Sequence, residues 1–414
     1  MLKGTKFKKY LERHVKYPPF VGEDPQSELR VIVTIPSCGE QHILDTLESI
    51  YGTVVEESNF EVLVILNHGA SASSRIKSIN EKSIVEIAKW RNARSIENLH
   101  VIKLFDLPDS VAGVGHARKT VMDEAMRRLI RANRSDGIIA CTDGDTCVDP
   151  DYVHDLIQIL NNSEENGFAY SFNFEHPLND LSSSHKHGIM QYELHLRYFR
   201  TAIRWTGHPH AFFTVGSAMA CRLSGYIQQG GMNQRKAGED FYFLQMFAKA
   251  YKLKYVPRIT VYPSARSSDR VPFGTGRAML EYQVSGKLKT YSFKSFRLLK
   301  NVFSSLEEWY HSREIKFDRL DHRITPFLNA TFAKQRIEHF RSQAKDRLQF
   351  ERLFYTWFDA FKFMKGLHYL RDEHGFKDVS VNQAFNELRS TEGEEPIRDL
   401  SLLLWHYRER DRID

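Results

Sequence analysis

Two carboxylates stand one residue apart where an apolar run ends. Residues 138–140 predict a buried strand, and Asp143 and Asp145 follow it with only Gly144 between them. Hard divalent ions such as Mg²⁺ or Mn²⁺ take one or two carboxylates and let phosphate oxygens complete the shell. The glycine would allow a close backbone approach. The pair therefore predicts a site for an ion that bridges the protein and a diphosphate, and a plain Asp-Gly turn is the alternative.

A calcium-binding loop is excluded for the same segment. Such a loop needs glycine at its sixth position and glutamate at its twelfth. Counted from Asp143, those positions hold Val148 and His154, and Cys147 stands at the fifth.

A second acidic pair, Glu239 and Asp240, opens an apolar helical pattern after Gly238. A transfer to a hydroxyl group needs one base that accepts the proton of that hydroxyl, and a carboxylate can do this. Asp240 could instead only cap the helix that starts there. Both interpretations place its carboxylate at a helix N-terminus, where the positive end of the helix favours the ionised form. The adjacent Glu239 opposes this effect, so we expect a nearly ordinary pKa and an ionised Asp240 at pH 7.

Three arginines, Arg266, Arg270 and Arg277, stand among serines, glycines and prolines in residues 261–279. Guanidinium groups suit phosphate oxygens, and the small residues suggest a loop that closes over a ligand. An ordinary surface loop is the alternative.

Histidines cluster in the middle of the chain without the spacing of a zinc site. Among His185, His187, His208 and His210 no pair has three residues between its members, and no cysteine stands beside them. His208 and His210, close to Trp205, are candidates for binding the acceptor, the molecule whose hydroxyl group would be modified. If that molecule is a carbohydrate, aromatic rings can stack on its sugar rings.

Strand and helix patterns alternate from residue 30 to about residue 174, and the alternation weakens after that. Continuous apolar strands separated by amphipathic helices predict a mostly parallel, Rossmann-like α/β sheet covered on both faces, with ligands at the carboxyl ends of the strands. Beyond residue 292 the patterns are helical. We expect a basic N-terminal arm (1–28), a catalytic domain (29–291) and an all-helical C-terminal module (292–414). The expected strands are 30–36, 60–66, 99–105, 137–142 and 167–174, and a strand-like segment follows later at 253–263.

Composition narrows the class of protein. Of 414 residues, 42% are hydrophobic and 27% charged, which is typical of a globular protein. The longest apolar run, 62–66, is far shorter than the roughly 18 residues of a membrane helix. The four cysteines form no CxxC pair, and we expect reduced thiols in a cytoplasmic protein without a secretory signal.

Positive charge is concentrated in residues 1–20, which hold six of the lysines and arginines against one glutamate. This argues against a nucleic-acid-binding face on the folded part. The arm could contact an anionic inner membrane surface, although a solvated arm is the preferred interpretation.

Taken in order, these motifs resemble those of the family 2 glycosyltransferases, which have the GT-A fold. The similar region runs from residue 30 to residue 277 and includes VIVTIPSCGE, LVILNHGAS, AGVGHARKT, DGD and GED. Asn67 and His68 stand where the family usually has an aspartate that reads the nucleotide base, and Lys119 stands where asparagine is usual. The matched positions are Pro36, Glu40, Asn67, Arg118, Asp143, Asp145, Glu239 and Asp240.

The resemblance implies a metal-dependent enzyme that moves a sugar from a UDP- or GDP-sugar to a carbohydrate or lipid-linked acceptor, with inversion at the anomeric carbon. By the same resemblance, Asp145 is the principal ligand of Mg²⁺ or Mn²⁺, with Asp143 closer to the ribose, and Asp240 is the general base beside Glu239. Pro36, Glu40, Asn67, Arg118, Asp143, Arg266 and Arg270 would bind the donor.

Other functions remain as alternatives. A nucleotide-dependent oxidoreductase is disfavoured because AGVGHAR has Arg118 where the third glycine of its motif belongs. A nucleotidyltransferase would need a glycine-rich loop after the first strand. An inactive scaffold that binds a partner through its helical module is disfavoured by Asp143, Asp145 and Asp240. The module, rich in aromatic residues, could pack on the catalytic domain or form a homo-oligomer.

Overall fold

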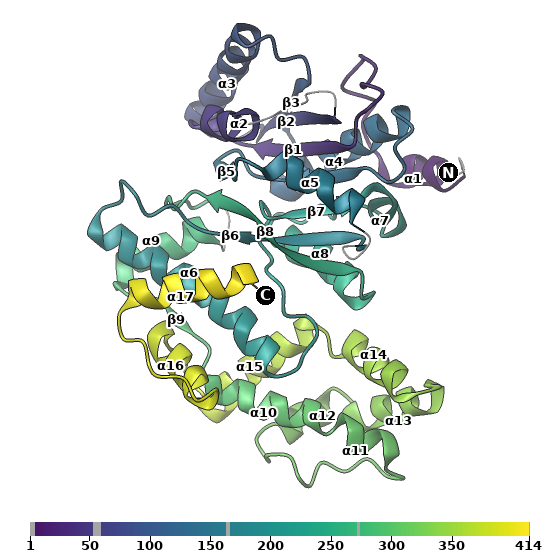
Figure 1. Ribbon diagram of the computed structural model, residues 1–414, viewed down its shortest axis with the longest axis vertical. Helices are drawn as coiled ribbons and strands as arrows, with labels where there is room; N and C mark the ends of the chain where they lie inside the picture. The colour runs from purple at the N-terminus through teal and green to yellow at the C-terminus, as the bar shows by residue number, and fades with distance from the viewer. Residues whose placement is uncertain (1–4, 53–58, 163–165, 271–273, 414) are drawn as a thin grey trace.

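The computed structural model describes residues 5–52, 59–162, 166–270 and 274–413 (Figure 1). Its centre is an eight-stranded mixed sheet of order β3-β2-β1-β4-β7-β6-β8-β5. The strands are β1 (Val31–Ser37), β2 (Phe60–Gly69), β3 (Leu99–Leu107), β4 (Ile138–Cys141), β5 (Thr146–Val148), β6 (Ala169–Phe174), β7 (Met219–Arg222) and β8 (Leu253–Pro263).

Helices cover both faces of this sheet, as the alternating patterns predict. Successive residues of a strand point to opposite faces, so Val31 and Val33 join one hydrophobic core and Ile32 joins the other. The helices up to β8 are α1 (Thr5–His14), α2 (Ile43–Tyr51), α3 (Ser74–Ala93), α4 (Val114–Arg131), α5 (Tyr152–Asn161), α6 (Ser183–Trp205), α7 (Leu223–Gln228) and α8 (Glu239–Lys249).

The sheet contains two antiparallel strands that the apolar patterns did not predict. β7 lies between β4 and β6 and runs antiparallel to both, and β5 pairs antiparallel with β8 at the edge. Both are short and lie in segments rich in glycine or polar residues, where a pattern of apolar positions gives no signal. Strands β1, β2, β3 and β4 pair in parallel, as do β6 and β8.

The N-terminal segment is not the solvated arm that its charge indicates. Tyr10, on α1, is only 3% exposed and donates a hydrogen bond of 2.8 Å to Asp123 on α4. Lys119 contacts the same carboxylate at 2.9 Å. The segment therefore packs on the rest of the protein through apolar and aromatic side chains. A count of its lysines does not reveal this. Residues 1–4, with Lys3 of the predicted arm, lie outside the described residues.

The C-terminal part is helical and shares a core with α6. Met190, Leu194 and Tyr198 of α6 join the hydrophobic cluster of the later helices. The predicted all-helical module contains one short strand, β10, which pairs with β9 just before the module begins. The elements are α9 (Thr275–Ser285), β9 (Lys289–Thr290), α10 (Phe293–Ser304), α11 (Leu306–His311), α12 (Thr325–Ala330), α13 (Ala333–Gln343), α14 (Arg347–Trp357), α15 (Ala360–His374), β10 (Val379–Ser380), α16 (Val381–Thr391) and α17 (Leu400–Ile413).

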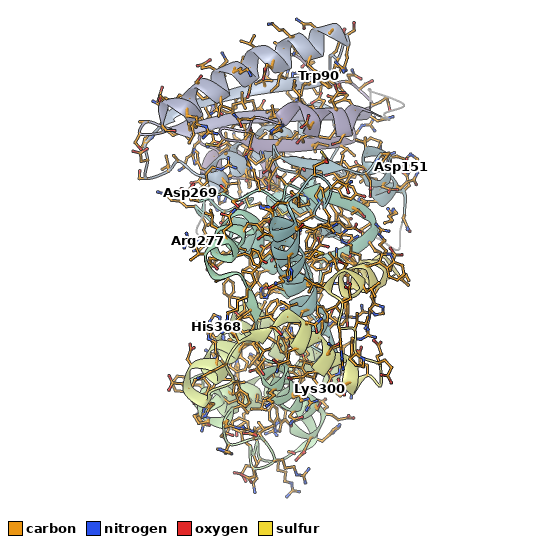
Figure 2. All side chains as sticks on the ribbon, turned by 90° about the vertical axis from the view of Figure 1, so that its left-hand side faces the viewer. Trp90, Asp151, Asp269, Arg277, Lys300 and His368 are labelled. Atoms are coloured by element: carbon orange, nitrogen blue, oxygen red, sulfur yellow. The ribbon has the colours of Figure 1, made fainter. Side chains whose placement is uncertain are left out.

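The molecule is elongated, with the sheet near one end and the C-terminal helices at the other (Figures 1 and 2). Figure 2 shows Trp90 of α3 near the first end and Lys300 of α10 near the second. Helix α17 returns from the far end to pack on α6 and β8. In the described part of the chain, no helix combines the length and hydropathy required to cross a membrane. All four cysteines are free, and Cys141 and Cys221 are buried.

Candidate active site

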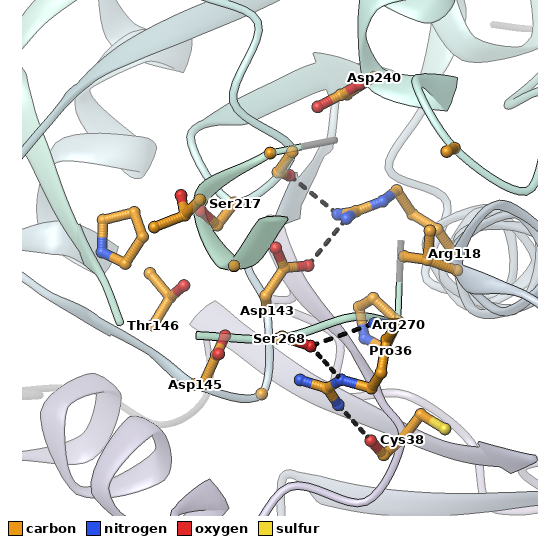
Figure 3. Close-up of a pocket in the computed structure, with 18 of the residues that line it drawn as sticks. Pro36, Cys38, Arg118, Asp143, Asp145, Thr146, Ser217, Asp240, Ser268 and Arg270 are labelled. Atoms are coloured by element: carbon orange, nitrogen blue, oxygen red, sulfur yellow. Dashed lines mark hydrogen bonds and ion pairs between the residues drawn. The ribbon is translucent and has the colours of Figure 1, made fainter. Parts of the chain in front are cut away.

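A cleft of about 640 Å³ opens at the carboxyl ends of β1, β2, β4 and β6 (Figure 3). This is the position that a parallel α/β sheet favours for a ligand. Apart from Arg277, every residue that the sequence assigns to the donor, the metal or the base lines this cleft. These residues are Pro36, Glu40, Asn67, Arg118, Asp143, Asp145, Glu239, Asp240, Arg266 and Arg270.

Arg118, on α4, connects the two acidic pairs. Its side chain is 2% exposed, and its Nη2 donates to Asp143 Oδ1 at 2.8 Å while its Nε donates to Glu239 Oε1 at 3.1 Å. Its Nη1 donates to the carbonyl of Gly216 at 2.8 Å. Arg118 thus holds the acids in register, whereas the resemblance implied contact with the donor. Opposite charges outweigh desolvation and raise its pKa above the ordinary range, so it is a permanent cation.

Asp240 extends into the cleft from the first turn of α8, and Figure 3 shows its carboxylate pointing toward the aspartate motif. Its Oδ1 accepts a hydrogen bond of 2.7 Å from the backbone N–H of Phe241. The N-cap of the helix is Gly238, in the left-handed region with φ of 70°. Gly216 makes room for Arg118 and Asp240, because an added Cβ there would lie 2.8 Å from Arg118 Nη2 and 3.3 Å from Asp240 Oδ2.

The expectation of an ordinary pKa for Asp240 is wrong. Burial and the adjacent charge of Glu239 raise its pKa to about 7, although Arg118 and the Phe241 N–H act in the other direction. Sequence reasoning weighed the helix N-terminus against Glu239 and omitted desolvation, which is the largest effect. The carboxyl group therefore keeps its proton to a higher pH than an ordinary aspartate does.

Asp145 belongs to a second charged group on the opposite wall. Arg266 Nη2 lies 2.8 Å from Asp145 Oδ2 and 2.5 Å from Glu40 Oε2. Arg270 Nη1 lies 2.6 Å from Glu40 Oε1 and donates to the carbonyl of Cys38 at 2.5 Å. Glu40, after β1, thus gathers two arginines that follow β8. Residues 271–273 of the predicted closing loop lie outside the described part.

The residues at this wall fit a divalent cation. Burial and the charges of Glu40 and Asp143 raise the pKa of Asp145 to about 6, despite Arg266 and Arg270, so a further cation beside this carboxylate would favour its ionised form. Among the described residues, no three His, Cys, Asp or Glu side chains converge as a metal cage. A donor set of one or two carboxylates suits an ion whose remaining ligands are phosphate oxygens and water.

The second strand brings Asn67 and His68 to the far side of the cleft. His68 is 3% exposed, stacks on Phe105 with ring centroids 4.3 Å apart and is 3.1 Å from the Asn80 amide. The backbone carbonyl of Asn67 accepts from the same amide at 3.0 Å. Asn80 therefore fixes the end of β2 through His68 and the Asn67 backbone. The side chain of Asn67 is not used in these contacts.

The histidines proposed for the acceptor lie elsewhere. His208 and His210 are 2% and 3% exposed, and His208 Nε2 lies 2.7 Å from the carbonyl of Phe358 in the C-terminal core. Trp205 packs on Phe293 with ring centroids 4.8 Å apart. None of the three lines the cleft. Their aromatic neighbours signalled a hydrophobic core and not a sugar-binding surface.

Arg277 is also separate from the cleft. It lies at the surface of α9, where Nε is 3.3 Å from Glu281 Oε1, one helical turn away (Figure 2). Of the three arginines, only Arg266 and Arg270 line the cleft.

The structure adds residues that sequence reasoning missed. Ser217 and Lys236 line the cleft, as do Tyr192 and His176. His176 comes two residues after β6. The rule that ligands meet the carboxyl ends of strands could have found it, because 167–174 was recognised as a strand. Tyr192 lies in the middle of α6, and no sequence signal marked it.

Comparison with known proteins gives a distant likeness. No protein-family model matches the chain, and no match was found among curated protein sequences. TarS from S. aureus, solved with UDP-GlcNAc, is 14% identical with a TM-score of 0.40, covering 90% of this chain and 94% of the other. The mannosyltransferase PcManGT from Pyrobaculum calidifontis, solved with GDP-Man and Mn²⁺, is 14% identical with a TM-score of 0.40 and coverages of 98% and 91%.

Glucosyl-3-phosphoglycerate synthase from Mycobacterium tuberculosis, solved with Mn²⁺, UDP and phosphoglyceric acid, is 15% identical. Its TM-score is 0.38, with 67% of this chain and 88% of the other covered. At these values the likeness is distant, and the function proposed below is inferred from the residues of this chain.

Proposed function

We propose that this chain is a metal-dependent glycosyltransferase that moves a sugar from a nucleoside-diphosphate sugar to an acceptor hydroxyl with inversion. The observation that carries the proposal is the convergence of two acidic pairs and two arginines on one cleft. One pair leads to Asp240, whose pKa of about 7 suits a general base at neutral pH. The other leads to Asp145, which lies beside the cationic groups Arg266 and Arg270.

The division of roles follows from position. Asp240 accepts the proton of the acceptor hydroxyl while the hydroxyl oxygen forms a bond to the anomeric carbon. The bond from that carbon to the diphosphate oxygen breaks on the opposite face, and its electron pair leaves with the diphosphate. Arg118, already paired with Asp143 and Glu239, holds the base and the aspartate motif at a fixed separation.

The leaving group needs positive charge. Asp145, with Asp143 beside it, would hold Mg²⁺ or Mn²⁺, and a bound ion would neutralise charge on the departing diphosphate. Arg266 and Arg270 lie on the same wall and can turn from Glu40 toward phosphate oxygens, to which guanidinium groups bind in a fork. Asn67 stands at the corner of β2 where it can hydrogen-bond a nucleotide base.

Incubation with a panel of UDP- and GDP-sugars, with Mn²⁺ or Mg²⁺, tests the proposal. Without a known acceptor, water replaces it, and slow release of UDP or GDP from one donor is expected. EDTA should abolish the release, and added Mn²⁺ should restore it. Absence of release from all donors, together with no calorimetric binding of UDP or GDP plus Mn²⁺, would contradict the proposal and favour the scaffold alternative.

A further inference from the structure

A buried ionic network links the C-terminal helix to the cleft. Arg408, on α17, donates from Nε to Glu193 Oε1 and from Nη2 to Glu193 Oε2, both at 2.8 Å. Arg197 reaches the same carboxylate at 2.9 Å and also pairs with Asp411 of α17. Glu193 and Arg197, on α6, are fully buried. We call Arg408, Asp411, Glu193 and Arg197 the α17 latch.

The latch ends on a residue of the cleft. Glu193 Oε2 accepts from the backbone N–H of His176 at 2.8 Å and lies 3.1 Å from His176 Nδ1. Arg408 Nη2 donates to the backbone carbonyl of His176 at 2.9 Å. The other ring nitrogen of His176 lies 3.2 Å from the hydroxyl of Thr275, the first residue of α9. The backbone on both sides of His176 and one edge of its ring are thus held from α6 and α17.

We propose that Arg408 is a positioning residue for the active site: through Glu193 it fixes His176, which forms the wall of the cleft at the place where the acceptor, or water in its absence, would lie. This rests on the proposed transferase function. It deepens that function by assigning an acceptor half to the cleft and by giving the C-terminal helix a role in it.

The chemistry of this half of the cleft fits a carbohydrate hydroxyl. His176 meets Tyr192 edge to face with ring centroids 5.9 Å apart and Phe174 with centroids 5.6 Å apart. All three line the cleft that Asp240 enters. Burial raises the pKa of Tyr192 to about 12, so its hydroxyl remains a neutral donor. Aromatic surface with a few oriented polar groups matches a sugar ring with its hydroxyl edge.

A geometric argument explains why a remote arginine matters. Orientation contributes much of the rate in transfer reactions, and a displacement of about 1 Å that originates far from the chemistry can cost on the order of 10²-fold. Glu193 has its pKa held well below the usual range, because Arg197, His176 and Arg408 outweigh its burial. Removal of Arg408 would free the backbone of His176 from α17 while Arg197 still compensates Glu193.

A double-mutant cycle measures the coupling. The substrate is the sugar nucleotide that the wild-type chain hydrolyses, with water as acceptor. Arg408→Gln and His176→Asn should each slow hydrolysis by about tenfold to 10²-fold, with the calorimetric Kd for UDP or GDP plus Mn²⁺ within about twofold of wild type. The double variant should be no slower than the slower single variant. Arg410→Gln is the matched control, because Arg410 lies on the same helix and pairs with Glu392 instead.

Diethylpyrocarbonate labelling, read by mass spectrometry, tests the latch without any enzymatic activity. His176 is 1% exposed and should be protected in the wild type and in Arg410→Gln, and labelled at least about tenfold faster in Arg408→Gln. His208, buried in the C-terminal core, should stay protected in all of them, which separates local release from unfolding. If Arg408→Gln does not fold, Arg408→Lys keeps the charge and loses the fork.

Unchanged labelling of His176 in a folded Arg408 variant would overturn the latch, and additive losses in the cycle would overturn its action through His176. A wild-type chain that neither hydrolyses a donor nor binds UDP or GDP with Mn²⁺ contradicts the proposed function alone, because the labelling result stands by itself.

Discussion

Two buried ionic networks contact the cleft, and they differ in the balance of positive and negative charge. In the first, Arg118 alone faces Asp143, Glu239 and the nearby charge of Asp240, and the pKa of Asp240 is raised to about 7. In the second, Arg197 and Arg408 share Glu193, whose pKa lies well below its usual range. The first network has fewer cations than carboxylates, whereas in the second network two guanidinium groups compensate Glu193.

The difference in charge balance distinguishes groups suited to proton transfer from groups that fix the structure. A group whose environment moves its pKa toward neutrality can exchange protons at physiological pH. A carboxylate with two guanidinium partners cannot, but it orients the elements that hold it. The first network lines the cleft, whereas the second lies behind it and reaches it through His176. The residues that we propose for the reaction are thus unbalanced in charge, and the residues behind them are paired.

The largest effect should come from removing the proton acceptor of the unbalanced network. Asp240→Asn should reduce transfer, or donor hydrolysis, by about 10²–10⁴-fold, which is the usual contribution of a general base. Affinity for UDP or GDP with Mn²⁺ should stay within about twofold, since the donor wall is separate. Initial rates and calorimetry on the same preparation measure both quantities.

The control is Asp151→Asn, because Asp151 also stands at the start of a helix, α5, is exposed and makes no capping hydrogen bond. It should behave as wild type. A rate for Asp240→Asn within a few-fold of wild type would leave Asp240 as a residue of the first helical turn and nothing more.

A substitution in the second network should lower the free energy of unfolding. Glu193→Gln leaves Arg197 and Arg408 without their shared carboxylate, and breaking a buried ion pair costs about 3–5 kcal/mol. Urea unfolding should show this loss. Glu409→Gln, which removes an exposed partner of Arg412, should change the free energy of unfolding by less than about 1 kcal/mol. Equal effects for the two variants would mean that the burial of Glu193 has no energetic importance.

Asp240 should also lower the stability of the fold at high pH. Because the folded-state pKa of Asp240 is raised to about 7, its favourable contribution is present below about pH 4 and is lost as the pH rises through 7. Asp240→Asn should therefore stabilise the fold at pH 8 by on the order of 1–3 kcal/mol, and by little at pH 4. Thermal unfolding at both pH values checks the sign, and destabilisation at pH 8 would contradict it.

The residues proposed to bind the donor could be predicted from the sequence, and those of the proposed acceptor half of the cleft could not. Asp143, Asp145 and Arg118 lie within or next to strongly patterned strands and helices, so local spacing is enough to bring them to one edge of the sheet. Arg266 and Arg270 were found because their chemistry is conspicuous in a loop. The order of the elements was visible for the same reason, whereas β5 and β7 are too short for an apolar period.

The proposed acceptor half of the cleft depends on contacts between distant parts of the chain. Arg408 and His176 are 232 residues apart, and nothing near either residue announces the other. His208 was attractive for its aromatic neighbours, but such neighbours also build a core, and only the three-dimensional packing distinguishes the two environments. The pKa of Asp240 was mispredicted for a related reason, since desolvation is a property of the whole fold.

The smallest and most specific effect concerns the charge beside the base. Glu239 raises the pKa of Asp240 and occupies Arg118, which lowers it. Glu239→Gln removes the repulsion and frees part of the guanidinium, so both changes move the pKa of Asp240 downward. The rising limb of kcat/KM against pH reports the base in the free enzyme, and its midpoint should move from near pH 7 to lower pH by about one unit. A midpoint that stays near 7 would mean that burial alone sets the pKa, and a midpoint that rises would mean that the limb belongs to another group.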